Sequence, residues 1–360
     1  MNAGGPLAGE HLGVPAGKKP AIKDVARLAG VAVGTVSNVL NDRPTVRPET
    51  RERVLAVIAQ LSYVPNATAR QLRKGEPTTV GAVVLDLANP FFTEMARGIE
   101  DRLSEGGYTL MLASSDEDPE RERRYLDLLL RQGVRGLLVT PSGTDTSHLR
   151  EIRDRGTDVV LLDFVSLELD SVGVDDVAGG AIAATHLLDG GRTRLALLNG
   201  PRTVRQCEER YAGVERAILA RELDLESTLT EITMDAAPLT VDIAEAATHA
   251  LFDQPGPPPD GIVCINDIVA LGALQALRAR GLSVPGDVAV VGYDDVMFAP
   301  MLATPLTSVR QPARQLGWTA ADILLSGGER TQSRHVEFTP ELVVRASSGA
   351  AAVAPASLNR

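Results

Sequence analysis

Long hydrophobic stretches are missing from this sequence. No uninterrupted apolar run reaches the roughly 18–20 residues of a membrane span, which argues against a membrane protein. The first twenty residues contain no apolar core, so we expect no secretory signal and interpret residues 1–19 as a disordered leader. The Ala-rich residues 348–360 are expected to be a disordered tail, without the leucine heptads of a coiled coil.

Cysteine and histidine are also scarce. Cys207 and Cys264 lie far apart in the sequence, and we interpret them as reduced thiols of a cytoplasmic protein. The five histidines show no metal-ligand spacing, so we expect no metal. A phosphate-cradling glycine loop and a nucleophile–base set are missing as well. We therefore expect neither catalytic residues nor a cofactor.

Charge is divided unevenly along a chain of ordinary globular composition, with 44% hydrophobic and 23% charged residues among 360. This length predicts two or three domains. Residues 18–76 contain eleven Lys and Arg against five Asp and Glu, a net charge of +6. Residues 1–17 carry only the negative charge of Glu10. The total of −11 therefore leaves residues 77–360 with a net charge of −16. A small basic segment before a large acidic one is typical of a DNA reader with a separate sensing domain.

The basic segment contains a helix-turn-helix pattern. An apolar stripe of helical spacing runs from Ile22 to Ala29 and is broken by Gly30, and a second helical pattern follows at once. A helix, a short turn with glycine and another helix are characteristic of DNA binding, with the second helix in the major groove. Its expected outward residues are Val33, Gly34, Thr35, Ser37 and Asn38.

A third helix should begin at Pro48, which suits the first helical position. Its apolar stripe is predicted to consist of Val54, Leu55, Ile58 and Leu61. Arg51, on the outside of this helix, is either a phosphate contact or a solvated surface charge. The first helix lacks a capping side chain, because Ala21 occupies its N-cap position.

Residues 65–77 are predicted to form a hinge. Asn66 is a good N-cap, the following residues favour a helix, and Gly75 ends it. A helix of about two turns is marginal by itself in water and would form on docking to DNA. Leu72 would then be a wedge in the minor groove. The alternative is an ordinary linker with one leucine resting on the neighbouring domain.

From Thr78 onward, β-branched strand patterns alternate with helical patterns of about 12 residues. This alternation predicts two doubly wound parallel sheets in two subdomains, with a ligand cleft at the carboxyl ends of the strands. Asp175, Asp176 and Asp267 are interpreted as helix caps. Side chains suited to hold a sugar or polyol follow the strands at Asp86, Asn89, Phe91, Phe92, Asp163, Phe164, Asn266 and Asp294, joined by Arg210.

Residues 22–75 resemble the DNA-binding headpiece and hinge of the LacI/GalR family of bacterial transcription repressors. Four blocks carry the resemblance in the family's order: IKDVARLAGV, TVSNVLN, VRPETRERV and YVPNATARQLRKG. The resemblance implies base reading by Val33, Gly34 and Asn38, and phosphate or peripheral contacts by Thr35, Ser37 and Asn41. It places Ala69 and Leu72 in the minor groove. Val33 and Gly34 depart from the longer polar side chains frequent at these positions and cannot make bidentate base hydrogen bonds.

The resemblance further implies an all-α headpiece at residues 20–64 and an α/β bilobal periplasmic-binding-protein-like domain at 78–347. Its N-lobe would comprise about 78–177 and 308–334, and its C-lobe about 178–307 and 335–347. By position, Arg210, Asn266, Asp294 and Gln311 match effector-binding residues of family members. Asp163 and the segment 89–92 match positions of the N-lobe that frequently bind the effector in family members.

These observations together lead us to expect a cytoplasmic repressor. It would bind a near-palindromic operator in double-stranded DNA as a homodimer. A mono- or disaccharide, or a derivative of one, would switch it from the cleft, as inducer or as corepressor. Two alternatives share a bilobal fold: a solute-binding protein and a sugar-modifying enzyme. The basic headpiece opposes the first, and the missing catalytic set opposes the second.

Overall fold

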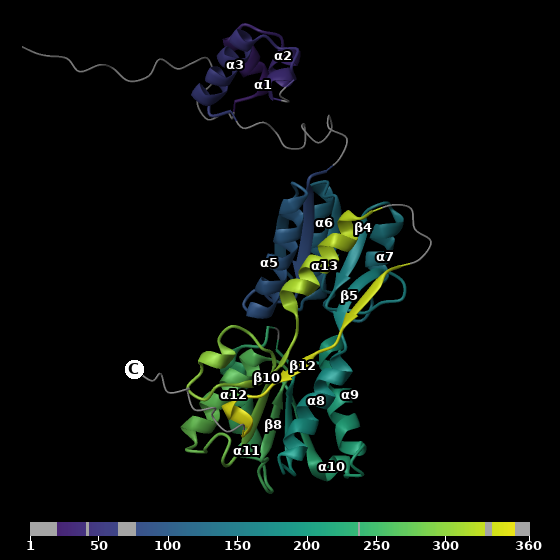
Figure 1. Ribbon diagram of the computed structural model, residues 1–360, viewed down its shortest axis with the longest axis vertical. Helices are drawn as coiled ribbons and strands as arrows, with labels where there is room; N and C mark the ends of the chain where they lie inside the picture. The colour runs from purple at the N-terminus through teal and green to yellow at the C-terminus, as the bar shows by residue number, and fades with distance from the viewer. Residues whose placement is uncertain (1–19, 41–42, 64–76, 237, 328–332, 350–360) are drawn as a thin grey trace, which may run out of the picture. The chain divides into compact units, whose positions relative to one another are not determined.

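The computed structural model describes residues 20–40, 43–63, 77–236, 238–327 and 333–349. Contacts divide the chain into two units, Met1–Glu76 and Pro77–Arg360, which are considered separately. Within the first, the described residues form a headpiece of three helices: α1 (Ile22–Ala29), α2 (Val33–Leu40) and α3 (Pro48–Gln60). Figure 1 shows the three packed around one another.

The headpiece has a small valine and alanine core. Val25, Val36 and Val54, one from each helix, are fully buried. The turn between α1 and α2 depends on Gly30, whose φ of 64° is the left-handed conformation that glycine adopts without strain. Pro48 opens α3 as predicted. Leu55 is 48% exposed, however, so its predicted place in the apolar stripe is wrong. Val57, two residues later, is buried instead.

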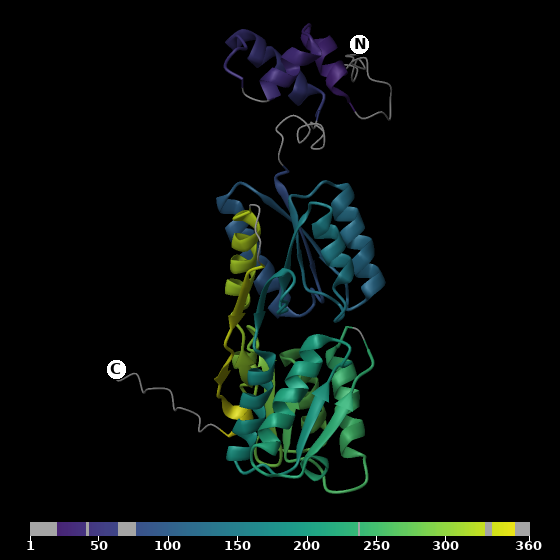
Figure 2. The same ribbon diagram turned by 90° about the vertical axis from the view of Figure 1, so that its right-hand side faces the viewer.

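The second unit contains two lobes, each built on a six-stranded sheet (Figures 1 and 2). The N-lobe sheet has the order β11-β5-β4-β3-β1-β2 and is parallel throughout. Its elements are β1 (Thr79–Val84), α5 (Pro90–Glu105), β2 (Thr109–Ser114), α6 (Pro119–Arg131), β3 (Gly136–Val139), α7 (Ser147–Asp154), β4 (Asp158–Leu162), β5 (Asp170–Val174), α13 (Ala313–Leu325) and β11 (His335–Phe338).

The C-lobe sheet has the order β12-β10-β9-β8-β6-β7, and only β12 runs antiparallel to its neighbour. Its elements are α8 (Asp176–Asp189), β6 (Leu195–Asn199), α9 (Arg205–Leu219), α10 (Leu225–Thr228), β7 (Leu229–Thr233), α11 (Val241–Phe252), β8 (Gly261–Cys264), α12 (Asp267–Ala279), β9 (Ala289–Asp294), β10 (Thr307–Arg310) and β12 (Glu341–Val343), with 3₁₀ turns at Ala299–Met301 and Ala346–Ser348.

The chain crosses between the lobes three times, and the crossings differ from the predicted boundaries. It leaves the N-lobe between β5 and α8, returns between β10 and α13, and leaves again between β11 and β12. β10 therefore belongs to the C-lobe and β11 to the N-lobe, the reverse of the prediction. Each is a short strand whose residues carry no sign of which sheet they join, since that depends on pairing partners far away in the sequence. Figure 2 shows the last segment passing from one lobe to the other.

In both sheets the strand order reverses beside the first strand of the lobe. β1 lies between β2 and β3, and β6 lies between β7 and β8. Such a reversal leaves a crevice at the carboxyl ends of the strands, where ligands bind in open α/β sheets. Several helices that follow these strands begin with a capping Asn or Asp, notably Asn89, Asp175 and Asn266. Polar side chains are thereby concentrated at the strand ends.

Candidate functional site

The exposed face of α2 is the candidate DNA-reading surface. Val33 is 42% exposed, and Gly34 and Asn38 are exposed as well, so these three agree with the predicted outward face. Thr35 is half-buried. Ser37 is only 8% exposed, which corrects its predicted outward position. It lies one residue after Val36, on the side of the helix that turns toward the core.

Arg51 has a structural contact that the sequence did not reveal. Its Nη2 donates a hydrogen bond to the Arg43 carbonyl oxygen at 2.7 Å and so ties α3 to the segment after α2. At the start of α1, the Asp24 carboxylate accepts a hydrogen bond from the Ala21 backbone N–H at 2.9 Å, which is the half of a capping box that does not need a polar side chain at Ala21. Asn41, Asn66, Ala69 and Leu72 lie outside the described residues.

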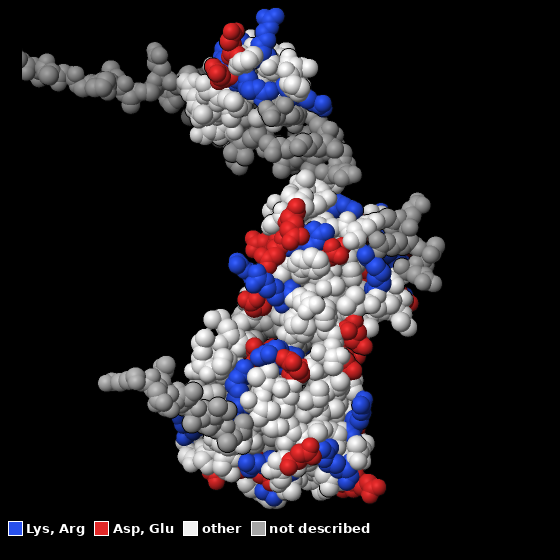
Figure 3. Space-filling model, viewed as in Figure 1, with Lys and Arg blue, Asp and Glu red and all other residues white. Residues whose placement is uncertain are grey.

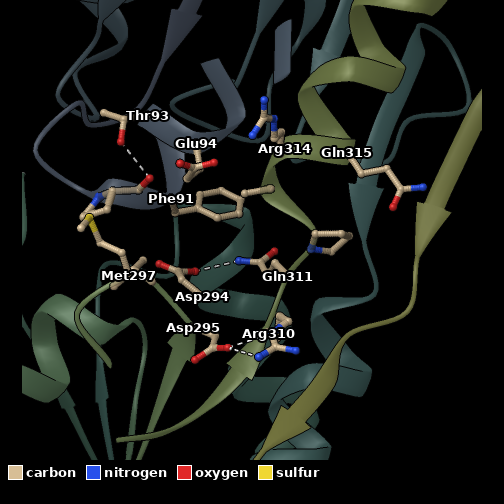
Figure 4. A pocket seen from close by; sticks show the side chains of 14 residues that line it. Phe91, Thr93, Glu94, Asp294, Asp295, Met297, Arg310, Gln311, Arg314 and Gln315 are labelled. Carbon is tan, nitrogen blue, oxygen red and sulfur yellow. Dashed lines mark hydrogen bonds and ion pairs between the residues drawn. The ribbon is translucent and has the colours of Figure 1, made fainter. Parts of the chain in front are cut away.

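Asp294, at the end of β9, is a meeting point of the two lobes (Figure 4). One carboxylate oxygen accepts from Asn89 Nδ2 at 3.0 Å, and the other accepts from Gln311 Nε2 at 2.7 Å. Burial raises the pKa of Asp294 to about 6, although Arg210 and both hydrogen bonds oppose the rise. Its φ of 101° is rare outside glycine, and strain of this kind is concentrated at functional sites.

Arg210 lies beneath the same edge of the C-lobe. Its Nε donates to Asp176 Oδ1 at 2.8 Å, its Nη1 donates to the Ile265 carbonyl oxygen at 2.6 Å, and its guanidinium lies 3.6 Å from the centre of the Tyr293 ring. Burial disfavours the arginine charge, but Asp176 and the neighbouring Asp294 and Asp163 raise the pKa of Arg210 above its ordinary value. Arg210 therefore stays cationic in a buried, carboxylate-rich setting.

Close contact of α8 and α9 makes the Arg210–Asp176 pair possible. A Cβ added at Gly180 would lie 2.1 Å from the Arg210 carbonyl oxygen, and one at Gly213 would lie 2.1 Å from the Val177 carbonyl oxygen. Only glycine permits these backbones to approach so closely. The two glycines thus bring together the N-terminal halves of α8 and α9, which carry Asp176 and Arg210.

Asp163 and Gln206 form a second link between the lobes. Gln206 Nε2 donates to the Asp163 backbone oxygen at 2.7 Å and to its Oδ2 at 3.0 Å, and both side chains are buried. Burial, reinforced by Asp176, raises the pKa of Asp163 to about 7, against the opposing effect of Arg210. Next to this link, Arg205 Nη1 donates to the Val165 carbonyl oxygen.

The predicted aromatic residues contribute mainly to packing. Phe91 and Phe92 are 3% and 6% exposed, join the hydrophobic core and meet edge-to-face with their ring centres 5.1 Å apart. Phe164 is 9% exposed, and the Arg205 guanidinium lies 4.5 Å from its ring centre. Of the three, Phe91 lines a cavity of about 400 Å³ between the lobes, together with Asp294, Met297, Arg310 and Gln311 (Figure 4).

Asp86 and Asn266 are occupied by backbone hydrogen bonds. Asp86 accepts from the Ala88 N–H at 2.8 Å, and burial and the nearby Asp116 raise its pKa. Asn266 accepts from the Val269 N–H at 2.9 Å and caps α12. The caps predicted at Asp176 and Asp267 are wrong. Asp176 holds Arg210, and Asp267 accepts from the Val296 N–H and the Ser308 hydroxyl.

In the described part of the chain, the side-chain atoms buried without a hydrogen-bond partner include four near the lobe boundary that also make no ion pair. They are Asp163 Oδ1, Gln206 Oε1, Gln311 Oε1 and Thr140 Oγ1. Buried polar atoms without partners are rare in folded proteins, since each costs about 1–3 kcal/mol. Thr140 and Asp163 follow the ends of strands, Gln311 lies at a lobe crossing, and Gln206 lies in the first turn of α9 against Asp163. A molecule bound between the lobes would supply the missing partners.

Two family models match the chain. "Bacterial regulatory proteins, lacI family" matches residues 21–66, and "Periplasmic binding protein-like domain" matches residues 184–348. The repressor PurR of Vibrio campbellii is 36% identical over 90% of this chain and 97% of its own length. The ribose operon repressor of Bacillus subtilis is 36% identical over 84% of this chain and 90% of its own length. The chain belongs to the LacI family.

Solved structures of LacI-family regulators agree with this assignment. A lac repressor dimer bound to operator and the anti-inducer ONPF has a TM-score of 0.75 at 28% identity, and covers 92% of this chain and 100% of its own. A complex of the regulator CelR with cellobiose has a TM-score of 0.67 at 32% identity, and covers 91% of this chain and 99% of its own. The predicted fold is thus confirmed: a helix-turn-helix headpiece followed by a bilobal periplasmic-binding-protein-like domain. As a LacI-family protein, the chain is a DNA-binding transcriptional regulator.

Several features of this LacI-family chain are independent of the family match. No helix among the described residues is long and apolar enough to cross a membrane, and in that part of the chain no group of three or more His, Cys, Asp and Glu could hold a metal ion. Both cysteines are buried free thiols. On the face drawn in Figure 3, blue and red groups of the bilobal domain lie side by side, so this face presents no extended basic surface.

Sequence reasoning missed Gln206, Asp176 and Thr140. Gln206 stands four residues before Arg210, so one helical face carries both, and that spacing was the available signal. Asp176 follows a strand and was interpreted as a cap, because its pairing with Arg210 is 34 residues away. Thr140 comes directly after β3 and satisfies the strand-end rule, but a single threonine is too common to stand out.

Proposed function

We propose that this protein is a repressor that binds a near-palindromic operator as a homodimer and is switched by a small polyhydroxylated molecule between its lobes. The observation that carries the proposal is the buried polar set at the lobe boundary: Asp163, Arg210, Asp294 and Gln311, drawn from both lobes and their crossing. Carboxylates, amides and a guanidinium in this arrangement suit the hydroxyl groups of a sugar.

On the DNA side, α2 would read the major groove in each half-site, with the two helices of a dimer about 34–36 Å apart. Asn38 would hydrogen-bond a base edge, and Val33 would contact a thymine methyl. Thr35, Asn41 and Arg51 would contribute phosphate or peripheral contacts, whereas Ser37 is buried in the headpiece. In the hinge, Asn66 would cap a short helix, with Ala69 and Leu72 in the minor groove at the operator centre.

Coupling between the two functions would pass through the lobe boundary. Three chain crossings and the contacts Asn89–Asp294 and Gln206–Asp163 join the lobes. A ligand bound among these residues changes the angle between the lobes and, in a dimer, the spacing of the two hinges. Both polarities fit the residues: an inducer that separates the hinges and a corepressor that orders them.

The proposed effector is a mono- or disaccharide or a derivative of one. One support is the name of the ribose operon repressor from Bacillus subtilis, and another is the pair of LacI-family structures with ribose and with cellobiose. Because the relatives are named as repressors rather than enzymes, we assign this chain no reaction and no cofactor. We place its action in the cytoplasm, where bacterial DNA is.

A DNA-binding titration tests the proposal. Fluorescence anisotropy of a labelled operator would be measured with full-length protein, alone and with each of a broad panel of pentoses, hexoses and disaccharides at millimolar concentration. We expect at least one sugar to change the operator dissociation constant by about 10-fold or more. An unchanged dissociation constant with every member of the panel would sink the assignment of the cleft.

A further inference from the structure

The atoms left without partners at the lobe boundary share one chemical character. Gln206 Oε1 and Gln311 Oε1 are buried hydrogen-bond acceptors, and Asp163 Oδ1 is a third acceptor when its carboxylate is ionised. The fourth, Thr140 Oγ1, is a hydroxyl that can donate or accept. A molecule that satisfies this site must therefore bring hydrogen-bond donors, at least one for each acceptor.

The orientations of both glutamine amides are fixed by their neighbours. Gln206 Nε2 faces the Asp163 backbone oxygen at 2.7 Å and Asp163 Oδ2 at 3.0 Å. Gln311 Nε2 faces Asp294 Oδ1 at 2.7 Å. A flipped amide would set its oxygen against these acceptors, and no proton would lie between the Gln206 oxygen and the Asp163 carbonyl. Each Oε1 is therefore an acceptor that faces away from its carboxylate.

Charge at the site reinforces this selection. Asp163, Asp176 and Asp294 all raise the pKa of Arg210 through their negative charge. Arg210 is the one buried Lys or Arg among the described residues. Two of the three guanidinium nitrogens already donate to protein oxygens, Nε to Asp176 and Nη1 to Ile265. Three carboxyl groups around one guanidinium leave little positive charge for a further anion.

We infer that the effector is an uncharged, donor-rich molecule, a free sugar or polyol, and that the site rejects the corresponding sugar phosphate or sugar acid. The inference rests on the proposed function and narrows it. A carboxylate or a fully ionised phosphate offers only acceptors, which would meet Gln206 Oε1 and Gln311 Oε1 without a shared proton. Gln206 is the specificity-determining residue in this scheme, because it presents one acceptor while it links the lobes.

Matched pairs of ligands test the inference on the full-length protein. Isothermal titration calorimetry would compare ribose with ribose 5-phosphate, and glucose with glucose 6-phosphate and gluconate, with cellobiose as a disaccharide probe. We expect a free sugar to bind and its phosphate or acid to bind at least about 100-fold more weakly. Equal or tighter binding of a phosphate or acid overturns the inference but leaves a ligand-switched regulator standing. Binding of none of these probes counts against the inference and the sugar effector together.

A substitution at Gln206 gives a second readout. Gln206→Arg replaces the buried acceptor with donors and positive charge, so we expect free-sugar affinity to fall about 10-fold or more and the preference over the phosphate to shrink or reverse. Gln254→Arg, in an exposed loop after α11, makes the same chemical change far from the site and should alter neither value. Thermal unfolding shows whether each variant is folded. An unchanged preference in folded Gln206→Arg would contradict the assigned role of Gln206, and so would the same change in the control.

Discussion

Asn89 Nδ2 lies 3.0 Å from Asp294 Oδ2, and this hydrogen bond joins residues 205 positions apart in the sequence, one from each lobe. Asn89 also accepts a hydrogen bond from the Phe91 N–H and caps α5 with the same side chain. Its amide is thereby held in one orientation, with the oxygen toward the helix and the nitrogen toward the carboxylate. The first helix of the N-lobe is thus oriented toward a cleft carboxylate of the C-lobe.

Asp294→Asn should weaken this connection and the effector response together. An amide can accept through its oxygen from Asn89 or from Gln311, but its nitrogen cannot accept from the other. We expect the effector dissociation constant to rise about 10-fold or more, with operator affinity in the absence of effector changed much less. Parallel calorimetric and anisotropy titrations measure the two quantities. An equal loss of both would indicate a folding defect and contradict a local role.

Arg210→Met should destabilise the bilobal domain strongly. Among the described residues, the substitution leaves buried Asp176 with the Tyr293 hydroxyl as its hydrogen-bond partner, and loss of one member of a buried ion pair costs about 3–5 kcal/mol. Urea denaturation measures the free energy of unfolding. The double variant Arg210→Met, Asp176→Asn removes the stranded charge and should recover part of the loss. A double variant no more stable than the single one would show that the charge is not the cause.

Stability of the bilobal domain should fall as pH rises from about 5 to about 8. The pKa values of Asp163 and Asp294 are raised to about 7 and about 6, so the folded state holds protons that the unfolded state has already lost above about pH 4. Their contribution to stability is fully present below about pH 4 and is lost as pH rises through the folded pKa values. Urea midpoints at several pH values measure the slope. Asp163→Asn should flatten it, and a midpoint that increases toward pH 8 would contradict the assignment.

Gly213→Ala should disturb the site through the backbone. The added Cβ would lie 2.1 Å from the Val177 carbonyl oxygen, so α8 and α9 must separate, at a cost of about 1–3 kcal/mol. Separation also lengthens the Arg210–Asp176 contact, and we expect a weaker effector response as well as a lower melting temperature. Gly143→Ala is the matched control, since its Cβ would meet nothing within 4 Å. A similar shift in both variants would show that helix spacing is not responsible.

Leu72→Ala should weaken specific operator binding much more than non-specific binding. A minor-groove wedge acts only where the hinge is ordered on the operator, whereas non-specific affinity depends on phosphate contacts. Anisotropy with operator and with scrambled DNA at one salt concentration gives both constants. Asn38→Ala serves as the comparison, because it too should reduce specific affinity, by about 1–3 kcal/mol, while leaving the hinge intact. If Leu72→Ala lost the same affinity for operator and for scrambled DNA, the minor-groove role of Leu72 would be contradicted.

Local signals predicted the elements of this fold better than their assembly. Pro48 and Asp175 mark helix starts because capping is a matter of a few neighbouring residues. Strand ends likewise indicated Asp163 and Asp294, since parallel sheets gather them at one edge. The sheet membership of β10 and β11, the Asp176–Arg210 pair and the Gln206–Asp163 link depend on partners tens to hundreds of residues away. No short pattern encodes such pairings.

The three lobe crossings have a consequence for the synthesis of the protein. When the ribosome has released the chain up to about residue 300, the N-lobe still lacks α13 and β11, and the C-lobe still lacks β10 and β12. Neither lobe can close its sheet until the last fifth of the chain has emerged, so folding of both is delayed to the end of translation. The headpiece is complete far earlier. A nascent chain would therefore possess its DNA-reading helix well before it acquires the means to control it.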